Sequence, residues 1–151
     1  MADTDPTATD LTPDVHARAA AFRRVREAHQ TEMAEDYVEL IGDLIAEHGE
    51  ARLTDLAEHM GVSLATAAKV VQRLSREGLV RSRPYRSLFL TTEGEAMADR
   101  SRARHRIVYE FLVALGVNPE TAALDSEGVE HHVSDETLAL FRAFADRRAS
   151  C

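Results

Sequence analysis

The chain has 151 residues, a net charge of −8 and 44% hydrophobic residues, enough for one or two small domains with a modest core. No stretch approaches the roughly 20 apolar residues of a membrane span, and no secretory signal pattern opens the sequence. The single cysteine, Cys151, excludes an internal disulfide framework and a thiolate metal cage. We therefore expect a soluble, cytoplasmic protein.

The charge is unevenly distributed along the chain. Residues 51–90 carry seven Lys and Arg against three Asp and Glu, whereas residues 1–50 carry four against twelve. Residues 91–151 are again acidic, with seven against eleven. A polyanion would therefore meet the middle of the chain and be repelled by its flanks, although chance clustering in a short window could give the same pattern.

The first third of the chain predicts a tail followed by one long helix. Residues 1–14 are acidic and rich in Thr and Pro, which is typical of a disordered tail. From about Val15, apolar residues recur at spacings of three and four, and Gly49 ends the pattern. The apolar stripe of this helix consists of Phe22, Val25, Met33, Tyr37, Leu40, Ile41, Leu44 and Ile45.

The next segment predicts two short helices separated by a tight turn at Gly61. Ser63 is placed to cap the second helix, which Gly78 ends. Two β-prone runs, 79–80 and 88–90, then flank a basic stretch that contains Pro84, which predicts a hairpin. Helix–turn–helix followed by a hairpin indicates a winged helix-turn-helix domain, which we place at residues 15–91.

The remaining residues, 92–151, predict an all-helical domain. Thr92 and Glu95 have the spacing of a capping box that opens a helix running to about Leu115. Asn118 and Pro119 begin another helix, and Ser134 caps the last one. The predicted fold class is therefore mostly α, a winged helix-turn-helix followed by a helical domain.

The second helix of a helix-turn-helix enters the major groove of DNA. Lys69 can approach guanine acceptors and Gln72 can pair with adenine, although either could contact phosphate instead. The candidate DNA-contacting residues are Ser63, Thr66, Lys69, Gln72 and Arg73 on this helix, with Arg83 and Arg86 in the hairpin. A winged helix that contacts another protein is the alternative, but a second helix and wing that are basic together favour DNA.

Metal-ligating side chains gather at three places. Asp36 and Glu39 share a face of the first helix, and His105 lies on the helix that begins near Thr92. In EGVEHH, the residues Glu127, Glu130 and His131 would share a face if the segment is helical. Oxygen and nitrogen donors without sulfur suit manganese, and more weakly iron(II). Each group taken alone could equally be a solvated surface cluster, so the residues by themselves leave a metal site open.

Five segments in chain order resemble the manganese transport regulators of the diphtheria-toxin-repressor superfamily: EDYVELIGDLI, GVSLATAAKVVQRLSREGLV, LTTEGE, RHRIVYEFLVALGV and EGVEHHVS. The resemblance implies a winged-helix homodimer whose helical domain binds metal and dimerises. It also implies a two-manganese cluster held by Asp36, Glu39, His105, Glu127, Glu130 and His131. Ala65 departs from the small polar residue or proline that relatives often carry there. His132 has no counterpart among these ligands and is interpreted as a surface residue or one that lies next to a ligand.

The resemblance implies a manganese(II)-activated repressor of manganese-uptake genes that binds a palindromic operator in double-stranded DNA. Iron-responding relatives carry a sulfur side chain where this chain has Asp36 and Glu127, which favours manganese, but an iron(II)-responsive repressor is the alternative. A winged-helix repressor of the MarR type, responding to a small organic ligand, is a second alternative. We do not expect an enzyme, since the chain has no HExxH motif and no Gly-rich phosphate loop.

Overall fold

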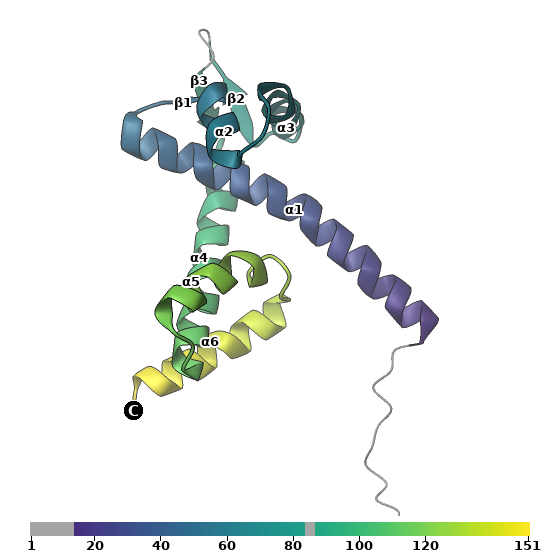
Figure 1. Cartoon of the computed structure of the whole chain (residues 1–151), viewed down its shortest axis with the longest axis vertical. Coiled ribbons are helices and arrows are strands. Elements are labelled where there is room, and N and C mark those ends of the chain that lie inside the picture. Colours follow the sequence, from purple (N-terminus) through teal and green to yellow (C-terminus); the bar gives the residue numbers. More distant parts are fainter. Residues whose placement is uncertain (1–13, 84–86) are drawn as a thin grey trace, which may run out of the picture.

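A computed structural model describes residues 14–83 and 87–151 (Figure 1). Residues 1–13 of the expected tail (1–14) and the hairpin residues Pro84, Tyr85 and Arg86 lie outside the described residues. Over the described residues, helices and the strands of one small sheet follow in the order α1, β1, α2, α3, β2, β3, α4, α5, α6. In the described part of the chain, no helix is long and apolar enough to cross a membrane.

Helix α1 (Val15–His48) is 34 residues long. The Asp14 carboxylate caps it by accepting the Ala17 N–H at 2.7 Å. The helix ends at Gly49 as predicted, and this glycine has the left-handed conformation at φ 78°. The predicted apolar stripe is buried only in the second half of the helix. Phe22 is 61% exposed and Val25 45% exposed, because the first turns of α1 extend beyond the body that covers the rest (Figure 1).

The two predicted short helices are α2 (Leu53–Met60) and α3 (Leu64–Arg76). Gly61 makes the turn between them at φ 65°, and the Ser63 hydroxyl accepts the Thr66 N–H at the start of α3. The predicted hairpin is formed by β2 (Val80–Ser82) and β3 (Ser87–Leu90). A further strand that the sequence did not suggest, β1 (Ala51–Arg52), pairs antiparallel with β3 and gives the strand order β1-β3-β2.

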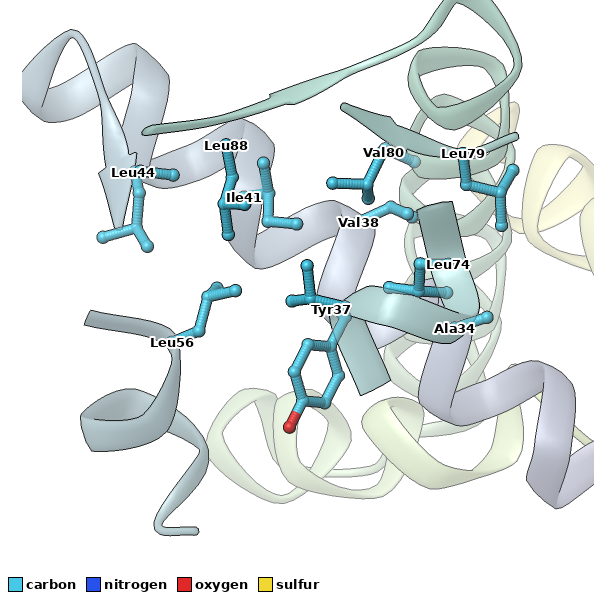
Figure 2. Packing of buried hydrophobic residues seen from close by; sticks show 13 residues of the cluster. Ala34, Tyr37, Val38, Ile41, Leu44, Leu56, Leu74, Leu79, Val80 and Leu88 are labelled. Atoms are coloured by element: carbon cyan, nitrogen blue, oxygen red, sulfur yellow. The ribbon is translucent and has the colours of Figure 1, made fainter. Parts of the chain in front are cut away.

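The core of the winged-helix half lies where α1, α2, α3 and the sheet meet, as Figure 2 shows. Val38 and Ile41 of α1 are fully buried against Leu56 of α2 and Leu74 of α3. Burial of a Leu or Ile side chain contributes about 1.5–3 kcal/mol. This packing fixes the second half of α1, including its carboxylates, to the winged helix.

Helices α4 (Thr92–Leu115), α5 (Pro119–Val129) and α6 (Asp135–Ala149) form the predicted helical half, with α4 leading to it from the sheet (Figure 1). The rings of Phe111 on α4 and Phe141 on α6 stack with centroids 3.8 Å apart. The predicted cap of α4 was wrong by one residue. Thr91 has the extended backbone and its hydroxyl accepts the Gly94 N–H, whereas Thr92 is already helical. The expected fold class is confirmed.

Candidate metal centre and nucleic-acid interface

The six predicted metal ligands come from three helices and the turn after one of them. Asp36 and Glu39 lie one turn apart on α1, and His105 lies on α4. The shared face expected for Glu127, Glu130 and His131 depended on a helical EGVEHH segment, but α5 ends at Val129, so Glu130 and His131 lie beyond its last residue. The chain turns there, and the structure brings the side chains of this segment to α1 and α4 through that turn.

His131 is at the centre of the first group of contacts. Its Nδ1 lies 2.5 Å from Glu35 Oε2 on α1, and its Nε2 lies 3.4 Å from Asp36 Oδ1. The same Nε2 is 3.3 Å from Glu130 Oε1, and the His131 side chain is only 1% exposed. A buried imidazole therefore joins the turn after α5 to carboxylates of the winged-helix half.

Glu130 links this group to a second one on α4 and α5. Its Oε2 lies 3.4 Å from His105 Nδ1, and that nitrogen is also 3.7 Å from Glu127 Oε1. Glu130 has a side chain 3% exposed, whereas that of Glu127 is 69% exposed. Glu39, half-buried on α1, is near enough to Glu127 and Glu130 for the charges to interact. The structure thus brings all six predicted residues together.

The titration of this cluster reflects crowded carboxylates in a buried place. Burial raises the pKa of Glu130 to about 8, against the lowering effect of His131, and the charges of Glu39 and Glu127 raise it further. Burial also raises the pKa of Glu39. For His131 burial favours the neutral ring, but the neighbouring carboxylates outweigh it and raise the pKa to about 10.

Two buried atoms of the cluster have unused coordination capacity. Glu130 Oε2 and His131 Nε2 have no hydrogen-bond partner of good geometry among the described residues. Buried polar atoms are costly without a partner, and carboxylate oxygens with imidazole nitrogens are donors that manganese accepts. Two groups of side chains, His105 with Glu127 and Glu130, and Asp36 with His131 and Glu32, have spacings suitable for one ion each. The residues therefore fit a divalent cation.

Sequence reasoning missed the residue that positions this turn. The Arg104 guanidinium donates to the Glu130 carbonyl at 2.9 and 3.1 Å, to the Val133 carbonyl at 2.5 Å and to Asp135 Oδ1 at 2.9 Å. Its side chain is 20% exposed. Arg104 thereby satisfies carbonyl groups freed by the end of α5. An arginine beside His105 carries no signal in the sequence that could have indicated these distant partners.

The predicted DNA-contacting side chains that are described lie on the surface of α3 and the wing. Lys69 and Gln72 are exposed, whereas Arg73 donates to Glu77 at 2.8 Å. The Ser63 hydroxyl donates to Thr66 Oγ1 at 2.9 Å while it caps α3. Arg83 of the wing lies over the Phe89 ring, 4.5 Å from its centroid. Arg86 lies outside the described residues.

Comparison with known families assigns both halves of the chain. Residues 29–88 match the model of the iron dependent repressor N-terminal DNA binding domain, and residues 91–151 match that of the iron dependent repressor metal binding and dimerisation domain. The chain belongs to the iron-dependent repressor family. The resemblance seen in the sequence is thereby confirmed.

Several relatives are similar over most of their length. The chain is 52% identical to the transcriptional regulator MntR of Escherichia coli O6:H1 over 147 residues, which is 96% of this chain and 95% of that protein. It is 40% identical to the HTH-type transcriptional regulator MntR of Geobacillus thermodenitrificans, over 69% of this chain and 74% of that protein.

Solved structures of longer proteins share the fold. A manganese-dependent transcriptional repressor in complex with manganese matches with a TM-score of 0.65 and 32% identity over 75% of this chain and 52% of that one. The manganese regulator SloR matches with a TM-score of 0.65 and 27% identity over 75% of this chain and 53% of that one. The chain therefore spans about half the length of these structures.

Proposed function

We propose that this chain is a homodimeric, manganese(II)-activated transcriptional repressor that silences manganese-uptake genes when manganese is ample. The observation that carries the proposal is the origin of the six donors. Asp36 and Glu39 belong to α1, which is packed into the winged helix, and His105, Glu127, Glu130 and His131 belong to the helical half. A ligand set divided in this way couples metal binding to the relative position of the two halves.

The coupling follows from the charges of the cluster. The carboxylates of Asp36, Glu39, Glu127 and Glu130 approach one another at the junction, where burial strengthens their repulsion. Bound divalent cations supply positive charge and coordination, which reverse the sign of this interaction. Asp36 and Glu39 are then held against Glu127 and Glu130. Each DNA-reading helix α3 therefore takes one position relative to the dimer. The metal binds this ordered arrangement more tightly than one in which the two halves are loosely held, and that difference in affinity drives the switch.

The donor chemistry favours manganese over iron. Positions 36 and 127 carry carboxylates, which are hard donors, and the cluster contains no sulfur. The names of the MntR relatives and the solved complex with manganese agree with this choice. The alternative most compatible with the same donors is an iron(II)-responsive repressor.

The DNA-facing residues follow from the same arrangement. We propose that α3 enters the major groove through Ser63, Thr66, Lys69, Gln72 and Arg73, and that Arg83 and Arg86 of the wing contact the backbone. A dimer would place two α3 helices on half-sites about one helical turn apart, which predicts a palindromic operator.

Selection of genomic DNA fragments by the purified protein tests the proposal. With manganese, we expect retained fragments to lie upstream of manganese-uptake genes, and with a chelator we expect no enrichment. Glu130→Gln should abolish the manganese-dependent enrichment, whereas Asp125→Asn, which changes an exposed carboxylate on α5, should not. Equal enrichment with manganese and chelator would refute metal activation, and activation by iron(II) alone would favour the iron alternative.

A further inference from the structure

Three side chains outside the six proposed manganese ligands meet beside the metal centre. His29 and Glu32 lie one turn apart on α1, and His132 follows the end of α5. One ligand atom from each lies within 4.8 Å of the others, which is a spacing suitable for a metal ion. The adjacency of His132 to His131 gave no reason to expect a second pair of partners on α1.

The two imidazoles converge on one oxygen of Glu32. His29 Nδ1 lies 3.1 Å from Glu32 Oε2, and His132 Nε2 lies 3.3 Å from the same oxygen. The two rings meet edge to face, with centroids 4.9 Å apart. The helical spacing of His29 and Glu32 and the turn after α5 together place three donors from two parts of the chain at one point.

The His29–Glu32 contact is a hydrogen bond, and both separations are also compatible with ligands that share a metal ion. Donors about 2.1 Å from zinc in a tetrahedral arrangement lie roughly 3.4 Å from one another, close to the 3.1 and 3.3 Å seen here. Two imidazoles and one carboxylate form a set typical of zinc and of iron(II), and less typical of manganese. The His29 side chain is 62% exposed, so water can complete the coordination.

We propose that His29, Glu32 and His132 form a second divalent-cation site, selective for borderline ions such as Zn²⁺. The site ties the middle of α1 to the turn after α5, next to the turn's contacts with Glu35 and Asp36. Because Glu32 is also close to Asp36 and His131, the second site adjoins the manganese centre, and its occupancy reinforces the same junction with a different metal.

The test is a zinc titration of the full-length chain, read by calorimetry and by the metal content retained after desalting. A background variant, Glu127→Gln with Glu130→Gln, weakens the manganese centre so that the second site is read separately. In this background we expect one zinc ion per chain to be lost on His29→Ala. The matched control is His16→Ala, which removes another exposed histidine of α1 and should leave zinc binding unchanged.

Cobalt(II) provides a second readout, because its visible absorption reports the coordination geometry of the bound ion. The band that appears on addition of cobalt to the background variant should be lost in His29→Ala and in His132→Ala. If the background variant unfolds, the same comparisons are made with Glu127 and Glu130 unchanged. There, His29→Ala should again lose one zinc ion. The proposal would be overturned if His29→Ala bound as much zinc as His16→Ala, whether both variants kept the ion or both lost it.

Discussion

Gly94 allows α4 to begin against the sheet, and its replacement by alanine should separate them. A Cβ atom at Gly94 would lie 2.1 Å from the Leu79 carbonyl oxygen and 3.4 Å from Leu90 Cβ. The obstructing atom belongs to the backbone, and it already accepts the Thr91 N–H at 3.1 Å. The first turn of α4 or the strand entry at Leu79 must therefore move by about 1 Å, because interiors are close-packed.

The cost of this displacement can be estimated. Overpacking by one methyl group costs about 1–3 kcal/mol, and a clash with backbone that cannot change rotamer belongs at the upper end. We expect Gly94→Ala to lower the free energy of unfolding by about 3 kcal/mol. For a chain of this size the melting temperature should fall by about 6–12 °C.

Urea and thermal unfolding of the metal-free protein, followed by circular dichroism, measure this effect. Gly128→Ala is the matched control, because Gly128 is helical and a Cβ there meets nothing within 4 Å. That variant should gain about 0.5–1 kcal/mol from helix propensity. If Gly94→Ala were as stable as the unchanged protein, the close approach of α4 to Leu79 would not exist.

Three further results are expected. First, raised folded-state pKa values mean that the folded protein holds protons more tightly, so the metal-free melting temperature should fall as pH rises from about 5 towards 8, where Glu130 ionises. Glu130→Gln should flatten this profile, and an unchanged slope would contradict the assignment. Second, Arg104→Lys should weaken manganese binding in calorimetry, since it loses the several hydrogen bonds that hold the turn after α5, whereas Arg106→Lys, on an exposed face of α4, should not. Third, Lys69→Ala should reduce the salt dependence of DNA binding by about one counterion. The control, Arg147→Ala on α6, should leave that salt dependence unchanged. A salt slope identical to that of the unchanged protein would exclude a phosphate contact by Lys69.

The sequence predicted those features that neighbouring residues decide. Gly49, Ser63 and Ser134 each end or begin a helix as expected, because a cap satisfies backbone groups within the same turn. The winged helix followed from apolar periodicity together with turn residues. The misplaced cap at Thr92 arose because two adjacent threonines offer the same chemistry, and only the backbone conformation distinguishes them.

The composition of the metal centre came from residue types and a family resemblance, but its construction depends on the tertiary structure. A shared face within EGVEHH depended on that segment being helical, but the chain turns after Val129 and Arg104 holds the turn from α4. The meeting of His132 with Glu32 likewise joins segments far apart in the chain. Local sequence determines which donors are present and which helices carry them. Packing between helices, which depends on the whole core, determines which donors share a site, how deeply Glu130 is buried and how its proton is held.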